Sequence, residues 1–158
     1  MEDWKKDRLA SALDGSNPTV LLRMKSGFVV FCDTQFLPGY CILLSDLNKG
    51  LLNDLPMEER MQFLADMTVV GDAITKTVAP LRINYAVMCN DLPLLHVHIT
   101  PRYEWERAER VRRPVQQYPH TCWSDPQYAW DRPEYAKLMA DLRTNLMDIY
   151  EKGLKEPV

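Results

Sequence analysis

The residues best suited to chemistry in this sequence are two of its three histidines, His96 and His98. Val97 lies between them and Ile99 follows, and this alternation is typical of a β-strand. Side chains two positions apart in a strand project from the same face, so the imidazoles are expected side by side, about 7 Å apart along the backbone. Such a pair can bind a metal, supply a nucleophile and an acid, or lie at a polar surface.

A metal site needs further ligands, and the nearest ones in the sequence are Glu104, Glu106 and His120. No carboxylate follows the pair at the short spacing of a cupin-like site. The segment His98-Ile99-Thr100 resembles half of a two-histidine phosphoesterase pattern, but residues 120–122 (HTC) do not supply the other half. We therefore expect no metal and no cofactor.

Short apolar runs predict the strands that position the histidines. The first three are joined by short connections that contain glycine, which is typical of an antiparallel meander. An apolar stripe at spacings of three and four, from Phe63 to Val78, predicts one long helix after them. The predicted strands are 19–24, 28–33, 40–45, 83–89 and 95–100, and the predicted helix is 56–78.

Other segments flank this unit. Residues 3–13 predict a helix. Asp131 as N-cap and the leucines from Leu138 to Leu146 predict a last helix that ends near Gly153. Residues 103–130 alternate prolines with aromatic residues, so we expect a long ordered loop that wraps the sheet edge or carries function. The fold class is α+β: an antiparallel sheet of about five strands with one long helix packed on it, plus short N-terminal and C-terminal helices.

Composition limits the classes of function. The 158 residues, with 46% apolar and 26% charged, fit a single domain over 1–158 with its core at about 18–103. A net charge of −3 argues against a nucleic-acid partner. The four cysteines form no C-x-x-C pair, the first residues lack the apolar core of a signal peptide, and no apolar run is long enough to span a membrane. We expect free thiols and a cytoplasmic location without membrane attachment.

Two separated motifs resemble the histidine triad (HIT) superfamily. Residues 90–103 (NDLPLLHVHITPRY) resemble its signature strand, where the Pro101-Arg102 pair sets the register and makes His96 the middle histidine and His98 the third. Residues 31–44 (FCDTQFLPGYCILL) resemble the family segment that runs from an acidic residue through Pro-Gly-His into an apolar strand. The resemblance covers roughly residues 18–103 and implies a HIT-like fold.

The resemblance also implies an activity and a role for four residues. It implies hydrolysis of a nucleotide phosphoanhydride or phosphoramidate, such as a dinucleoside polyphosphate, in which His96 attacks the α-phosphorus and becomes nucleotidylated. His98 would donate to a phosphate oxygen or to the leaving group. Asn90 would direct its amide toward the phosphates. Asp33 would accept hydrogen bonds from the ribose hydroxyls.

The sequence departs from the family pattern at two positions. Leu94 stands at the first histidine of the triad, and Tyr40 stands at the histidine of Pro-Gly-His. The alternative is therefore a catalytically weak nucleotide-binding or interaction module on the same scaffold. Tyr40 can orient a neighbouring group through its hydroxyl, and His120 is the only other imidazole in the chain. The resemblance further implies a homodimer formed by the 56–78 helix and the 83–89 strand.

Overall fold

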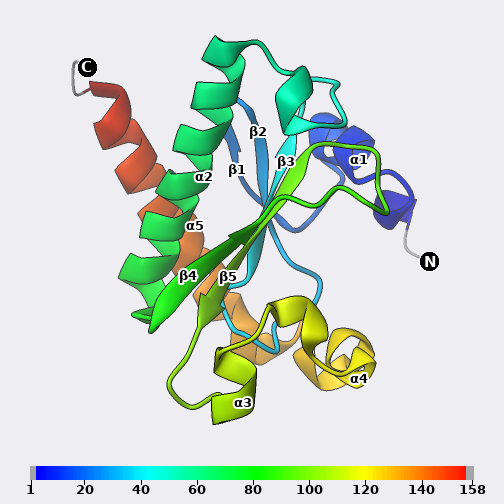
Figure 1. Ribbon diagram of the computed structural model, residues 1–158. Coiled ribbons are helices and arrows are strands. Elements are labelled where there is room, and N and C mark those ends of the chain that lie inside the picture. Colours follow the sequence, from blue (N-terminus) through cyan, green and yellow to red (C-terminus); the bar gives the residue numbers. More distant parts are fainter. Residues whose placement is uncertain (1–2, 156–158) are drawn as a thin grey trace.

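The computed structural model describes residues 3–155, and a five-stranded antiparallel sheet forms its centre (Figure 1). The strand order is β1-β2-β3-β5-β4, so the strand that carries both histidines lies between β3 and the edge strand β4. The first three strands form the expected meander. The strands are β1 (Val20–Met24), β2 (Gly27–Phe31), β3 (Cys41–Ser45), β4 (Arg82–Ala86) and β5 (His96–Arg102).

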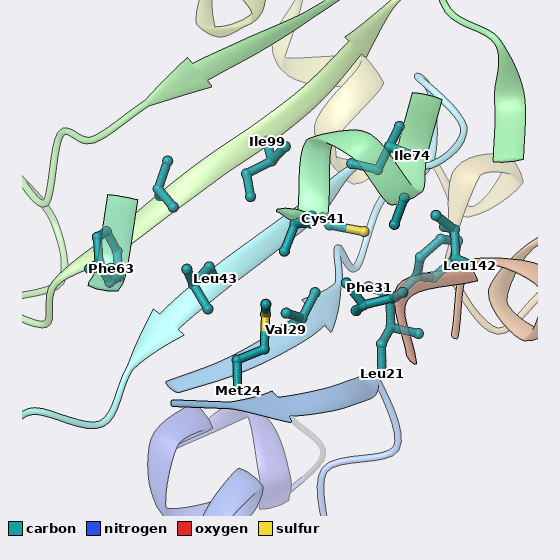
Figure 2. Packing of buried hydrophobic residues seen from close by; sticks show 14 of the residues in the cluster. Leu21, Met24, Val29, Phe31, Cys41, Leu43, Phe63, Ile74, Ile99 and Leu142 are labelled. Atoms are coloured by element: carbon teal, nitrogen blue, oxygen red, sulfur yellow. The ribbon is translucent and has the colours of Figure 1, made fainter. Parts of the chain in front are cut away.

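Two long helices cover one face of the sheet. Helix α2 (Met57–Val78) confirms the predicted 56–78 helix, and α5 (Pro133–Lys155) packs against α2 and β1. With 23 residues against 22, α5 is as long as α2, so the C-terminal helix is not the short element that was expected. Its leucines Leu142 and Leu146 are buried in the same apolar core as Phe63 of α2 (Figure 2).

Alternation along the strands separates an apolar face from a histidine face. Val97 and Ile99 are fully buried and pack with Leu43 and Phe31 in the core beneath α2. His96 and His98 project to the other face, where they are only partly buried. In the register, His98 lies opposite Ile42 of β3 on one side and Ala86 of β4 on the other. The predicted shared face of the two histidines follows directly from this pairing.

Short helices lie outside this layer pair. The N-terminal segment forms η1 (Asp3–Lys5) and α1 (Arg8–Asp14), and Figure 1 places α1 across the sheet from α2. A 3-10 turn, η2 (Leu52–Asp54), precedes α2. The segment 103–130, expected as a loop, contains four short helices: α3 (Ala108–Val111), η3 (Val115–Gln117), α4 (His120–Ser124) and η4 (Pro126–Tyr128).

A buried ion pair anchors the segment 103–130 to the end of β5. The Arg102 and Glu106 side chains are 1% and 0% exposed, and Arg102 Nη2 donates to Glu106 Oε2 at 2.8 Å. Arg102 also donates to the backbone oxygens of Arg110 and Arg113, at 2.6 and 2.7 Å. Tyr118 Oη donates to the same carboxylate at 2.5 Å. The arginine of the Pro-Arg pair therefore fastens the chain that follows it.

A second, smaller apolar cluster lies under the same segment. Phe36 and Leu37, from the connection between β2 and β3, pack with Val115, and several aromatic rings surround them. Phe36 contacts the Trp123 ring edge-on at 4.9 Å between centroids. Thr34 forms an isolated antiparallel bridge with Ala129. The aromatic segment therefore packs over the residues that join β2 to β3, next to the histidine face.

Candidate active site

His96 is held by the backbone of its own strand. Its Nδ1 lies 2.7 Å from the carbonyl oxygen of Leu94. A carbonyl oxygen can only accept, so Nδ1 carries the proton and the lone pair of Nε2 is left for chemistry. Leu94 thus contributes its carbonyl to the site, although its side chain replaces the first histidine of the triad.

His98 is held by a side chain. Tyr40 Oη lies 2.6 Å from His98 Nδ1, and the Tyr40 ring is buried. Burial raises the pKa of the Tyr40 phenol well above its usual value, and burial together with the nearby His96 lowers the pKa of His98 to about 4. Both groups are therefore neutral at pH 7. We assign the tautomer in which Tyr40 donates to Nδ1, so that Nε2–H of His98 is a donor.

The two rings lie close together with complementary functions. Their centroids are 5.0 Å apart and their planes meet at 78°. Across this gap, His96 offers a bare nitrogen and His98 offers an N–H. A nucleophile beside a neutral hydrogen-bond donor suits attack on an electrophile that carries a negatively charged oxygen, such as the phosphorus of a phosphate ester.

The segment 103–130 shields the Tyr40 side of the site. The Trp123 ring of α4 contacts Tyr40 edge-on at 6.3 Å between centroids. Tyr103 Oη donates to the carbonyl oxygen of Pro38, two residues before Tyr40. Trp123 was not predicted as a site residue, and the alternation of prolines with aromatic residues before the last helix is its only signal in the sequence.

The other predicted site residues, Asp33, Asn90 and His120, lie on three different segments of the chain. Asp33 follows β2, and its carboxylate forms a two-pronged ion pair with Arg8 of α1, at 2.8 and 2.6 Å. Asn90 is exposed in the connection between β4 and β5, one residue after Cys89, whose thiol lies 3.4 Å from the His96 backbone nitrogen. His120 is exposed at the start of α4. Sequence reasoning missed Arg8, because nothing in the N-terminal pattern links it to Asp33.

A cavity of about 350 Å³ adjoins the backbone that holds His96. The connection 92–94 forms one wall, and the N-terminal segment forms the other with Lys5, Lys6 and Arg8. Leu94 therefore belongs both to the cavity wall and to the anchor of His96. A ligand in this cavity meets Lys5, Lys6, Asp7, Arg8 and Leu9 on one side and the connection before β5 on the other.

Comparison with solved structures identifies the fold. A histidine triad protein from Marinobacter aquaeolei VT8 is 19% identical, with a TM-score of 0.69 over 90% of this chain and 94% of that one. A zinc-bound histidine triad family protein from Mycobacterium smegmatis is 13% identical, with a TM-score of 0.65 over 94% and 98%. A hypothetical histidine triad nucleotide-binding protein from Sulfolobus tokodaii strain7 is 12% identical, with a TM-score of 0.67 over 92% and 95%.

The chain therefore has the histidine triad fold, as its two motifs predicted. No family model and no curated protein sequence matches it. The structural likeness and the motif register therefore indicate the same fold, although the overall sequence identity to these structures is low. Within residues 3–155, no helix is long and apolar enough to cross a membrane, and the four cysteines are free thiols.

The zinc-bound relative raises the question of whether this chain has a metal site. Among residues 3–155, no three His, Cys, Asp or Glu side chains are grouped so that they could hold an ion. Nε2 of His96 has a free lone pair, but Nε2 of His98 carries a proton in the assigned tautomer, and Glu106 is engaged by Arg102. Glu104 and His120 are exposed. The residues of the described part of the chain therefore do not fit a zinc site.

Proposed function

We propose that this protein hydrolyses a phosphoanhydride or phosphoramidate of a nucleotide through a nucleotidyl-histidine intermediate on His96. The fixed and complementary tautomers of His96 and His98 carry the proposal. The Leu94 carbonyl keeps the proton on His96 Nδ1, which leaves the Nε2 lone pair to attack. In the tautomer assigned to His98, Tyr40 donates to Nδ1 and the proton of His98 is on Nε2. The nucleotide-binding name of the Sulfolobus relative agrees with a nucleotide as ligand.

In the first step, His96 Nε2 forms a bond to the α-phosphorus, and the bond from phosphorus to the leaving group breaks with its electron pair on the leaving group. The attached imidazole becomes positively charged, so its Nδ1–H bond to the Leu94 carbonyl strengthens. His98 Nε2–H donates to a phosphate oxygen while charge develops there. In the second step, water attacks phosphorus, the bond to nitrogen breaks, and a nucleoside monophosphate leaves.

The remaining predicted residues complete the proposal. Asn90 is exposed in the connection before β5, and we propose that its amide binds the phosphates. Tyr40 acts as a positioning residue, because it touches His98 rather than the reacting atoms. We also propose a homodimer in which two copies of the chain pair through α2 and the edge strand β4, and a monomer mass in sedimentation would contradict it.

The alternative is a weak nucleotide-binding module, and one observation favours it. The Leu94 side chain cannot form the hydrogen bond that a histidine in this position would form. The two functions differ in product formation. A catalyst releases a nucleoside monophosphate, whereas a binding module takes up nucleotide and returns it unchanged.

The decisive experiment compares the protein with its His96→Ala variant. Incubation with a dinucleoside polyphosphate is expected to yield a nucleoside monophosphate, and His96→Ala is expected to lower the rate by 10³-fold or more, because the nucleophile is gone. Acid-labile label from an α-³²P substrate should appear on the wild type and not on the variant. His120→Ala is the matched control, and full turnover by His96→Ala would disprove the assignment of the nucleophile.

A further inference from the structure

The carboxylate of Asp33 is occupied by a side chain of the protein itself. Arg8 Nη1 donates to Asp33 Oδ1 at 2.8 Å, and Nη2 donates to Oδ2 at 2.6 Å. Both side chains are about one-third exposed. Lys5 Nζ lies 3.9 Å from the same Oδ2. The guanidinium therefore approaches the carboxylate end-on, with one N–H for each oxygen, and a second cation lies nearby.

Further contacts hold Arg8 in this position. Its guanidinium lies over the Trp4 ring at 5.2 Å, and Trp4 meets Trp130 edge-on at 6.1 Å. The backbone nitrogen of Trp130 donates to the backbone oxygen of Asp33 at 3.0 Å. The contacts form a closed ring from Asp33 through Arg8, Trp4 and Trp130 back to Asp33. The N-terminal segment is thus docked against the residue that was expected to bind the ribose.

A ribose and an arginine compete for the same end of a carboxylate. A vicinal diol donates one O–H to each oxygen, in the same end-on geometry as the guanidinium. The guanidinium bonds join two charged groups and are stronger than bonds from neutral hydroxyls. The cavity beside Leu94 mixes the basic Lys5, Lys6 and Arg8 with the acidic Asp7, and Arg8 is held on Asp33 at its edge.

We infer that Arg8 occupies the diol-binding end of Asp33, so that the site binds nucleotides without reading their ribose hydroxyls. This inference rests on the proposed function, since it concerns the substrate of the same site. The protein then recognises a nucleotide through its phosphates. A nucleotide and its 2′,3′-dideoxy analogue are equivalent ligands for the wild type, and loss of Arg8 creates a preference for the ribonucleotide.

Calorimetric titration of the full chain with AMP and with 2′,3′-dideoxy-AMP tests the inference. The two dissociation constants of the wild type should agree within about twofold. In Arg8→Ala, the freed Asp33 should bind AMP about tenfold or more tightly than the dideoxy analogue, as expected for hydrogen bonds to a charged group. Thermal unfolding checks that the variant is folded, and Arg8→Lys, which keeps the charge but lacks the fork, should give an intermediate preference.

The matched control is Arg23→Ala. Arg23 also pairs with an aspartate, Asp46, and lies over an aromatic ring, Phe28, but it does not touch Asp33. Its removal should leave the ratio of dissociation constants at the wild-type value.

Two other outcomes would overturn the inference, and a third would overturn only the proposed catalysis. A wild-type preference for AMP above about threefold overturns the inference, because the ribose then displaces Arg8. A folded Arg8→Ala protein without a preference also overturns it, whether it binds both ligands equally or neither. If the predicted binding pattern is found and no nucleotide is hydrolysed, the proposed catalysis fails while the inference stands.

Discussion

The two faces of the sheet are stabilised in different ways. The face under α2 and α5 is an apolar core, in which Val97, Ile99 and the leucines of α5 pack without polar partners. The other face is organised by specific polar pairs: Tyr40 with His98, Arg8 with Asp33, and Arg102 with Glu106 at the end of β5. The first face is mainly apolar, although the buried Asp66 of α2 accepts hydrogen bonds from Ser26 there, whereas each pair on the second face needs one particular partner.

The apolar face mainly stabilises the sheet, whereas the polar face controls the residues of the candidate site. An apolar core tolerates many substitutions that keep its volume, so it can support the strand without defining what the strand does. A polar pair fixes the position and the protonation of both partners, and it leaves a costly unpaired group when one partner is removed. The residues that control the histidines are therefore concentrated on the polar face.

The largest expected effect comes from the buried pair at the end of β5. Glu106→Ala leaves the Arg102 guanidinium buried without its counter-charge, which costs about 3–5 kcal/mol. Because Arg102 fastens the segment 103–130, hydrogen exchange should accelerate first in that segment and least in α2. Leu146→Ala on the apolar face is the matched comparison, with a loss of about 2–5 kcal/mol that is shared by α2 and the central strands.

The two variants test whether the faces are separate. If Glu106→Ala accelerates exchange equally in α2 and in residues 103–130, the polar face is not a unit of its own. If Leu146→Ala opens only the C-terminal helix, the apolar face is not one cooperative core.

The apolar face could be predicted from the sequence, and the polar pairs could not. The alternation around Val97 and the stripe that includes Phe63 follow from strand and helix geometry, so β5 and α2 fall close to their predicted ranges. The bounds of α5 also lie close to the helix predicted from the Asp131 N-cap to about Gly153, although that helix was described as short. The Arg8 contact with Asp33 spans 25 positions and the Tyr40 contact with His98 spans 58, and no local pattern links such partners.

The candidate site could likewise be predicted only where residues of one strand set the positions of the side chains. The positions of His96 and His98 on one face could be predicted, since both belong to one strand. The suggestion that Tyr40 orients a neighbouring group agrees with its contact to His98, but the choice of that neighbour required the register of β3 against β5. The availability of Asp33 depends on how the N-terminal segment packs, and this tertiary contact has no sequence signature.

Removal of the Tyr40 hydroxyl should affect catalysis more than binding. In Tyr40→Phe, His98 Nδ1 loses its donor, so the ring samples both tautomers and the N–H toward the phosphate is partly lost. We expect kcat to fall about tenfold with little change in KM, and a stability loss of about 1–2 kcal/mol. Tyr40→His, which restores a hydrogen-bonding ring, should recover much of kcat. Unchanged ¹⁵N chemical shifts of His98 in Tyr40→Phe would contradict the positioning role.

A pH dependence of stability should also arise from His98. Its pKa is lowered from 6.5 to about 4 by burial and by His96, so between these values the unfolded chain binds a proton that the folded chain does not. Stability from this group is therefore present above pH 6.5 and is lost as the pH falls toward 4, by about 1 kcal/mol per pH unit. Urea unfolding at pH 7 and pH 5 should show this slope in the wild type and in His120→Gln, where the exposed histidine is changed. His98→Gln should have a shallower slope, and an equal slope in all three proteins would mean that His98 is charged in the folded state.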